Sequence, residues 1–483
     1  MKSLLRTNFK EVLVFIVVLS VAVIWTPAGR AQSSDGGKLD NQQIQKKLEQ
    51  LEQEILELKQ QMAEQAKANA APAAPAQPSE TGVKETITVT ATSQKSEPGE
   101  EANPIPLKTI DIYGFAMTDA GYRSGAIDPN WFDVIRPTKM ESFKGQFAPN
   151  GSAYFSVRQT RFGVSSFTPT ALGDLKTIFE FELFGTGVDQ GQTTFRLRHA
   201  WGELGQIGAG QTWSPFMDID VFPNSLEYWG PNGMVFFRNV QVRWTPYQKD
   251  DSNVMIALER PGASADGGVY SGRVELQNVR PQFKWPDLSG HVRKSGKWGH
   301  VQVAGMLRKI AWVDLGGPAH GNLNFSGTAT GWGVDVSSNL NFTKKDVGRF
   351  SFLYGSGVEN YMNDAPIDVG VKNNFGNPIS PVKGVALPVL GVVSFIDHNW
   401  SDQFSSAIGY SMLNISNSNA QSPSDFHQGH YALTNLLYHP AKPVTIGGEF
   451  QFGRRVNFSD GFSVNDYKVQ FSFKYNWSKG FTY

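Results

Sequence analysis

The chain has 483 residues, with 44 basic and 44 acidic side chains and no cysteine. The balanced charge argues against a nucleic-acid partner, and the lack of cysteine excludes a fold held together by disulfides. Aromatic residues make up 12% of the sequence although the mean hydropathy is only −0.31. This combination suits a membrane barrel in which about half of the wall residues face a wet interior.

The first 31 residues have the pattern of a secretory signal peptide. Basic residues precede the apolar run Val12–Trp25, and the small residues Gly29 and Ala31 precede Gln32. This order of basic, apolar and small-residue regions predicts cleavage before Gln32, so that residues 1–31 are removed. A membrane anchor is the alternative, but the run is shorter than the roughly 20 residues that a spanning helix needs. We therefore expect an exported chain without helical spans.

Residues 32–65 carry a heptad pattern. Apolar residues recur at alternating spacings of four and three residues, which is the seam of a coiled coil. Lys47 with Glu52, and Glu54 with Lys59, flank the seam as opposite charges that favour a parallel, in-register association. An amphipathic helix packed on another surface is the alternative, and the seam itself is compatible with a dimer or a trimer. The seam residues are Ile44, Leu48, Leu51, Ile55, Leu58 and Met62.

Two regions follow the coiled coil. Residues 66–106 are rich in Ala, Pro, Ser and Glu, which is the composition of a linker. Residues 107–483 show short alternating stretches separated by turn residues. At about 23 residues per strand and loop, this region gives roughly 16 strands, as in porins. We therefore expect an all-β fold, a transmembrane antiparallel β-barrel of about 16 strands in the bacterial outer membrane, preceded by a short α-helical coiled coil in the periplasm.

The expected strands show period-two alternation, which places successive side chains on opposite faces. In the last of them, Phe471–Tyr483, the aromatic residues share one parity and mostly small or polar residues share the other. Such a strand fits a barrel wall that faces lipid on one side and an aqueous lumen on the other. A tight turn is expected at His439–Pro443 and a long external loop at 413–428. The other clear strands are Thr109–Ala116, Thr177–Phe184, Thr194–Trp201, Val240–Trp244, Val274–Trp285, Gly331–Phe342 and Val444–Phe452.

Arginine is frequent on the polar parity of these strands. Arg196 and Arg198, for example, lie on the parity opposite Phe195, Leu197 and Trp201. Because a lipid-facing arginine at mid-depth costs about 2–4 kcal/mol, we expect these side chains to point into the lumen. The candidate pore-lining and solute-binding residues are Arg161, Arg196, Arg198, Arg243, Arg280 and Arg308.

Several arginines on one wall create a positive field that concentrates anions in a confined space. Guanidinium groups also match carboxylate and phosphate groups in bidentate geometry. The sequence therefore favours a channel for small anionic solutes, in particular carboxylates. A structural role is the alternative, in which the arginines pair with lumenal acids and stiffen the barrel. The candidate acids are Glu180, Glu182, Asp335 and Glu449.

The segment Trp213–Phe237 interrupts the strand rhythm. It contains three prolines, several aromatic residues and the acids Asp218, Asp220 and Glu227. We expect this segment to fold inward as a constriction loop, because its apolar residues need a surface that covers them. Acids on such a loop, facing a basic wall, would create a transverse field at the narrowest point. An ordinary external loop packed on a neighbouring subunit is the alternative.

Other functional classes fit the chain less well. A barrel enzyme needs a nucleophile or an acid pair beside a base, and none of the eight histidines lies in such a motif. His427 and His430 have loose metal spacing, but their loop lacks clustered acids, so we expect no metal and no cofactor. A phosphate-selective porin is the closest alternative because arginine binds either anion, and a sugar-selective porin comes next.

Several features together resemble porins of the DcaP-like family. They are the stretch Gly210–Phe216, the strand Phe195–Trp201, the ending Gly447–Arg455 with Lys468–Tyr475, and a coiled coil before a barrel of this size. The resemblance implies a homotrimer of barrels with a periplasmic coiled coil, taking up dicarboxylic and aromatic acids by diffusion. It also implies that the family's arginine-rich constriction corresponds to the inward arginines named above. The partners then expected are outer-membrane lipid and lipopolysaccharide, and peptidoglycan is a candidate partner of the linker.

Overall fold

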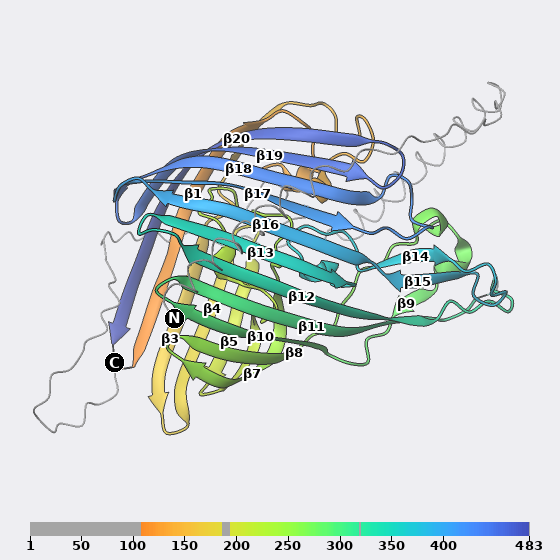
Figure 1. The fold of residues 1–483 in the computed structure, drawn as a ribbon, viewed down its shortest axis with the longest axis horizontal. Coiled ribbons are helices and arrows are strands. Elements are labelled where there is room, and N and C mark those ends of the chain that lie inside the picture. Colours follow the sequence, from red (N-terminus) through yellow and green to blue (C-terminus); the bar gives the residue numbers. More distant parts are fainter. Residues whose placement is uncertain (1–107, 186–193, 318–319, 483) are drawn as a thin grey trace, which may run out of the picture. The chain divides into compact units, whose positions relative to one another are not determined.

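The computed structural model describes residues 108–185, 194–317 and 320–482 (Figure 1). No helix in these ranges is long and apolar enough to cross a membrane. Three regions lie outside the described residues and stay predictions: the signal peptide (1–31), the coiled coil with its seam (32–65) and the linker (66–106).

Sixteen antiparallel strands form a closed barrel, which confirms the fold expected from the sequence. β1 (Thr109–Arg123) closes the ring by pairing with β20 (Ser463–Thr482). Closure leaves no unpaired strand edge in the wall, as a membrane requires. In chain order, the strands between these two are β3 (Arg161–Thr170), β4 (Gly173–Glu182), β5 (Arg196–Leu204), β6 (Ile207–Trp213), β7 (Arg238–Lys249), β8 (Ser252–Glu259), β10 (Asp287–Gly296), β11 (Gly299–Asp314), β12 (Gly327–Asn341), β13 (Asp346–Ser356), β16 (Pro388–Asn399), β17 (Phe404–Ile415), β18 (Phe426–Ala441) and β19 (Val444–Asn457).

Four short strands and six 3-10 turns lie in the connections of the described chain. β2 (Ser152–Ser156) pairs with the end of β1, and β9 (Val279–Pro281) pairs with the end of β11. β14 (Val369–Asn373) and β15 (Val382–Ala386) form a separate hairpin, which projects with β9 beyond one end of the barrel (Figure 1). The 3-10 turns are η1 (Pro129–Trp131), η2 (Pro137–Lys139), η3 (Ile219–Val221), η4 (Gly268–Tyr270), η5 (Val274–Leu276) and η6 (Glu359–Tyr361).

The alternation of β20 places its aromatic residues on the outside of the barrel. Phe471 and Phe473 are 63% and 50% exposed, whereas their neighbours Gln470 and Ser472 are buried on the inner side. An outer face of bare aromatic rings is stable in contact with lipid and would be an aggregation hazard in water. The predicted orientation of this strand is therefore the observed one.

The expected strand Val274–Trp285 is wrong. Its first residues form η5, only Val279–Pro281 is extended, and the barrel strand β10 begins at Asp287. Pro281 and Pro286 bracket the irregular stretch between β9 and β10. Because proline has no amide hydrogen, neither residue can donate to a neighbouring strand.

The two ends of the barrel differ in the length of their connections. At one end the strands join through tight turns, and the expected turn is present where β18 ends at Ala441 and β19 begins at Val444. At the other end the connections are longer, as at 357–387 and 416–425. Outer-membrane barrels have this asymmetry, with short periplasmic turns and long external loops.

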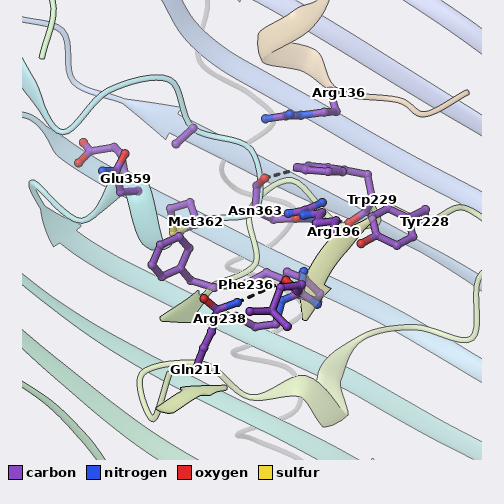
Figure 2. A pocket seen from close by; sticks show the side chains of 14 residues that line it. Arg136, Arg196, Gln211, Tyr228, Trp229, Phe236, Arg238, Glu359, Met362 and Asn363 are labelled. Carbon is purple, nitrogen blue, oxygen red and sulfur yellow. Dashed lines mark hydrogen bonds between the residues drawn. The ribbon is translucent and has the colours of Figure 1, made fainter. Parts of the chain in front are cut away.

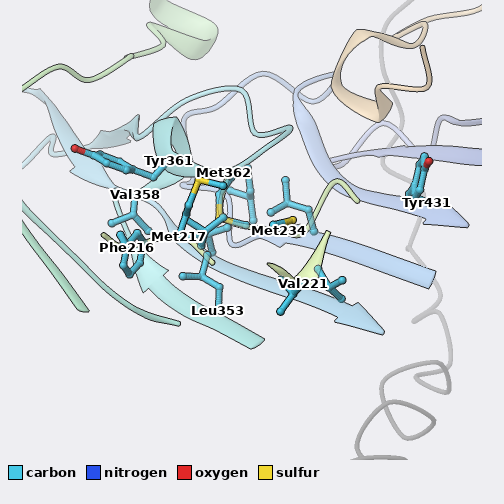
Figure 3. Close-up of a cluster of buried hydrophobic side chains, with 14 of the residues drawn as sticks. Phe216, Met217, Val221, Met234, Leu353, Val358, Tyr361, Met362 and Tyr431 are labelled. Atoms are coloured by element: carbon cyan, nitrogen blue, oxygen red, sulfur yellow. The ribbon is translucent and has the colours of Figure 1, made fainter. Parts of the chain in front are cut away.

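The main apolar core lies inside the barrel (Figure 3). Leu353 on β13 and Leu413 on β17 contribute from the wall, and both are fully buried. Phe216, Val221 and Met234 contribute from the connection between β6 and β7. Part of the lumen is therefore filled by a segment that packs on the inner wall.

Candidate functional site

The connection between β6 and β7 (residues 214–237), called here the inward loop, folds into the barrel. Near its start, buried Asp218 accepts hydrogen bonds from His300 Nε2 on β11 (2.6 Å) and Ser337 Oγ on β12 (2.8 Å). Asp218 also forms an ion pair with Arg293 on β10, at 3.2 Å. Burial opposes ionisation of Asp218, but the hydrogen bond from His300 and the nearby positive charges hold its pKa below the ordinary value. This carboxylate thus joins the loop to three neighbouring strands.

The middle of the inward loop reaches the strands next to the barrel closure. The backbone amides of Leu226 and Glu227 donate to the carboxylate of Glu449 on β19, at 2.7 and 3.0 Å. The side chain of Glu227 accepts hydrogen bonds from the amide of Ile135 (2.9 Å) and from Tyr431 Oη on β18 (3.3 Å). Burial raises the pKa of Glu227 to about 7. Both glutamates therefore position the loop.

The last part of the inward loop lies directly against the wall. The amide of Gly233 donates to Ser411 Oγ on β17, at 2.9 Å. A Cβ at this position would lie 2.1 Å from the carbonyl oxygen of Met412 and 2.8 Å from the amide nitrogen of Val392. Glycine is required for so close an approach of two backbones. Together with the apolar core, these contacts hold the loop on the inner wall formed by β11, β12, β17 and β19. A space remains beside β5, β6 and β7.

Four arginines share two glutamates on the wall of β3, β4, β5 and β7, where Tyr228 of the inward loop also donates a hydrogen bond to Glu182. The buried carboxylate of Glu182 on β4 lies 2.6 to 3.9 Å from a guanidinium nitrogen of each of the four. Glu180, also on β4, pairs with two of them. Four positive charges against two negative charges leave an excess of two positive charges. The four residues, called here the arginine group, are Arg161 on β3, Arg196 and Arg198 on β5, and Arg238 on β7.

A cavity of about 340 Å³ lies between the arginine group and the inward loop (Figure 2). Arg136, Arg196 and Arg238 supply its positive charges, and Trp229 and Phe236 of the inward loop supply aromatic rings. In Figure 2 the ring of Trp229 lies between Arg136 and Arg196. The guanidinium carbon of Arg136 is 4.0 Å from the centroid of that ring, a cation–π contact that fixes the arginine. The cavity therefore combines anion-binding groups with flat apolar surfaces.

Two arginines of the cavity have unused hydrogen-bond donors. The side chain of Arg238 is 6% exposed, and its Nη1 has no hydrogen-bond partner within the described chain. The closest acid oxygen to Arg196 is 3.8 Å away, beyond hydrogen-bond distance. Arg136, by contrast, is paired with Asp364 at 2.8 Å. Because a buried donor without a partner is unfavourable, the cavity suits a ligand that accepts hydrogen bonds.

Comparison with known proteins assigns the chain to a family. A model of the DcaP outer membrane protein family matches residues 109–477. The chain belongs to the DcaP outer membrane protein family. As a DcaP-family member it is an outer-membrane protein, in agreement with the location expected from its signal peptide pattern and barrel.

Solved structures similar to this DcaP-family chain include outer-membrane barrels. The outer membrane channel DcaP of Acinetobacter baumannii has a TM-score of 0.64 and 18% sequence identity, over 77% of this chain and 97% of that chain. An anion-selective porin from Comamonas acidovorans has a TM-score of 0.48 and 10% identity, over 77% of this chain and 100% of that chain. The first of these likenesses supports the fold. No curated protein matches the chain significantly.

The DcaP-family barrel brings three of the six predicted arginines together. Arg161, Arg196 and Arg198 meet at Glu182, in the arginine group. Arg243 also faces the interior, but it pairs with Glu203 at 3.0 Å near the tight-turn end. Part of the predicted set thus forms one site, and the pairing with Glu180 and Glu182 that the structural alternative described is present as well.

Trp201 is buried, although the strand pattern predicts that it faces outward opposite Arg198. A β-bulge lies between β4 and β5, where Glu180 pairs with His199 and Phe181 pairs with Leu197, so that Arg198 is the extra residue. A bulge shifts the parity of the residues that follow it. Trp201 therefore turns inward, and the guanidinium carbon of Arg243 lies 4.4 Å from its ring centroid.

The other two predicted arginines lie apart from the arginine group. Arg308 on β11 is fully buried between Asp287 (2.9 Å) and Asp368 (2.8 Å), so its charge is neutralised within the fold. Arg280 lies on β9, outside the ring of sixteen strands, and is exposed. Its guanidinium donates to the carbonyl oxygens of Gln277 and Val279.

The three predicted acids of the inward loop serve the loop itself. Asp218 and Glu227 are buried anchors, and exposed Asp220 pairs with Arg293. Among the described ion pairs, none joins these acids to the arginine group. The carboxylate oxygens of Asp218 and Asp220 and a ring nitrogen of His300 lie within 4.8 Å of one another, a spacing that could hold a metal ion. The guanidinium of Arg293 already supplies a positive charge at this place.

Sequence reasoning missed Arg136 and Arg238 as residues of the cavity. Arg136 precedes η2 in the connection between β1 and β2, and Arg238 is the first residue of β7. A connection places Arg136, and Arg238 shares the parity of the exposed residues Val240 and Val242, so strand parity does not reveal either one. The position of Arg238 directly after the aromatic segment Trp213–Phe237 was the available signal.

Proposed function

We propose that this protein is a diffusion channel for small anionic solutes, in particular dicarboxylic and aromatic acids. The observation that carries the proposal is the arginine group, whose four positive charges share two glutamates on one wall, beside a lumen that the inward loop narrows. An excess of positive charge in a confined, partly desolvated space raises the local concentration of anions. The same field repels cations, so the channel selects by charge before it selects by shape.

The free donors of the cavity support carboxylate binding. Arg238 Nη1 has no partner among the described residues, and Arg196 lies 3.8 Å from the oxygen of Glu182. A carboxylate accepts paired hydrogen bonds from guanidinium groups more strongly than a neutral group does. Trp229 and Phe236 offer rings on which an aromatic acid can stack. Weak, multiple contacts of this kind allow a solute to enter and to leave again.

The assembly proposed with this function is a homotrimer, with the short turns and the coiled coil in the periplasm and the long connections outside. Outer-membrane barrels have this orientation of turns and loops. The outward rings of β20 and its neighbours would contact outer-membrane lipid and lipopolysaccharide, and the linker is the segment that could reach peptidoglycan. A heptad seam would then hold three chains together below the membrane.

The test is a planar-bilayer recording of the purified full-length protein under a KCl gradient, with succinate, phthalate and phosphate added in turn. We expect an anion-selective reversal potential, conductance in steps of three, and current block by the two dicarboxylates. Block by phosphate with no effect of the dicarboxylates would favour a phosphate channel. Cation selectivity, or no conductance, would refute the proposal.

Matched variants locate the selectivity. Arg196→Gln and Arg238→Gln each remove one charge-assisted hydrogen-bond donor, and we expect the affinity for phthalate to fall about tenfold or more. Arg273→Gln removes an exposed arginine that pairs with Glu275 outside the barrel wall, and should leave selectivity and block unchanged. Equal effects of all three substitutions would indicate a diffuse surface field in place of a site.

A further inference from the structure

We propose that this protein has a second ligand site, an apolar pocket that binds amphiphilic carboxylates among the long connections. The pocket lies between β9, the end of β11 and the β14–β15 hairpin, and has a volume of about 370 Å³, within the range of small-molecule sites. No residue that lines it also lines the arginine cavity. The proposal therefore does not depend on the proposed function of that cavity.

The lining of this pocket is mainly apolar. Phe283, Ile310, Trp312, Phe325 and Val371 contribute to it from four different segments of the chain. The indole Nε1 of Trp312 donates to the carbonyl oxygen of Phe325 at 2.7 Å, so this ring offers the pocket an apolar face with its polar atom already satisfied. When a hydrocarbon or aryl group enters the pocket, the apolar surfaces of the ligand and of the pocket are both removed from water, which stabilises the bound state.

The charged residues of the pocket favour an anionic head group. Arg280 and Lys383 line the pocket, and neither forms an ion pair with an acid in the described part of the chain. Lys372 lies directly opposite Lys383 in the β14–β15 pairing, a juxtaposition of like charges that a bound anion would relieve. Asp266 is the acid of the lining, and its carboxylate accepts a hydrogen bond from the amide of Gly268 at 2.7 Å.

The size and the two kinds of lining define the ligand class. A carboxylate with an alkyl or aryl body would place its charge near Arg280 and its body against Trp312. Each buried methylene group contributes about 0.8 kcal/mol, or about a fourfold gain in affinity. An alkyl-substituted benzoate should therefore bind this pocket more tightly than benzoate does. The pocket lies on the long-connection side of the barrel, so the ligand need not cross the lumen.

The test is isothermal titration of the full-length protein in lipid nanodiscs with 4-butylbenzoate, benzoate and 4-butylbenzamide, corrected with empty nanodiscs. We expect 4-butylbenzoate to bind at least tenfold more tightly than either comparison ligand. Arg280→Gln removes the charge near the head group and should weaken 4-butylbenzoate about fivefold. Leu276→Trp fills the pocket from a partly buried position and should abolish the tight binding.

Controls separate this site from the channel. Arg196→Gln should leave the tight binding of 4-butylbenzoate unchanged while it weakens anion block, and Arg280→Gln should weaken the tight binding while it leaves anion block unchanged. Heat-resistant migration on SDS gels confirms that each variant is folded. Equal affinity for all three ligands, or tight binding that survives both Arg280→Gln and Leu276→Trp, would overturn the proposal. No binding by the wild-type protein would overturn it too, in favour of a pocket that lipid acyl chains occupy.

Discussion

The carboxylate of Asp218 on the inward loop lies 2.6 Å from Nε2 of His300 on β11, and both side chains are buried. The same carboxylate accepts from Ser337 and pairs with Arg293. One buried charge therefore fixes the start of the inward loop on three strands. Because the other side of this loop faces the arginine group, the width of the remaining passage depends on the Asp218 anchor.

The substitution Asp218→Asn should loosen this anchor. Asparagine keeps the shape but removes the charge, so Arg293 keeps only its exposed pair with Asp220 and His300 faces a neutral amide. Breaking a buried pair of this kind costs about 3 kcal/mol. We expect a lower thermal transition of the barrel and larger, noisier single-channel currents. Both can be measured on the same purified protein.

The neighbouring acid provides the control. Asp220→Asn alters an exposed residue that pairs with the same arginine, Arg293, and surface pairs contribute about 0–1 kcal/mol. We expect little change in stability or current noise. If Asp220→Asn had the larger effect, the loop would be fixed by its exposed turn and not by the buried carboxylate.

Arg308→Gln should separate stability from selectivity. The substitution leaves Asp287 and Asp368 without their buried partner, so we expect a loss of about 3–5 kcal/mol in stability. Its charge is already neutralised by these two acids, so the reversal potential of the folded fraction should not change. Arg196→Gln, at a partly exposed arginine of the cavity, should show the opposite result. A change of selectivity in Arg308→Gln would place Arg308 in the conducting path.

The sequence predicts the barrel because strand parity is a local property. The aromatic parity of Phe471 and Phe473 required no knowledge of neighbours, and the burial of Arg198 and Glu182 followed from the same period of two. Parity fails where the register changes. The bulge at Arg198 turns Trp201 inward, and the prolines around residue 283 replace a predicted strand by a connection.

The composition of the site is harder to predict, because loops that fold back into the lumen contribute much of it. Arg136 and Trp229 lie in different connections, and their stacking is a tertiary contact with no periodic signal. The sequence did indicate that the aromatic segment Trp213–Phe237 needs a covering surface. Which strands provide that surface follows from Asp218, Glu449 and Ser411, whose partners only the folded chain reveals.

A charge on the outer face of β20 tests the orientation of the wall. Phe473→Arg places a cation in the aromatic outer face, where lipid-facing arginine costs about 2–4 kcal/mol at mid-depth. We expect a lower folding yield in lipid vesicles and a lower unfolding free energy. Phe481→Arg, next to the end of the strand, should cost about 0–1 kcal/mol because it lies near the interface. Equal effects at the two positions would contradict a lipid-facing strand.

Two carboxyl groups from different connections meet beyond the barrel wall. Asp266 follows β8, Asp425 precedes β18, and both line one cavity. Burial and the contact with Asp266 raise the pKa of Asp425 to about 7, against which Arg455 and the amide of Ser422 act. We therefore expect a proton shared between the two carboxyl groups to hold these connections together.

This contact should weaken as the pH rises. The folded-state pKa of Asp425 is above its ordinary value of 3.8, so its contribution to stability is complete below about pH 4 and is lost as the pH passes about 7. We expect faster hydrogen exchange of residues 416–425 at pH 8.5 than at pH 6, after correction for the intrinsic rates. Asp425→Asn replaces the shared proton by an amide donor and should remove this difference. Slower exchange at pH 8.5 in the wild-type protein would show that the two carboxyl groups do not share a proton.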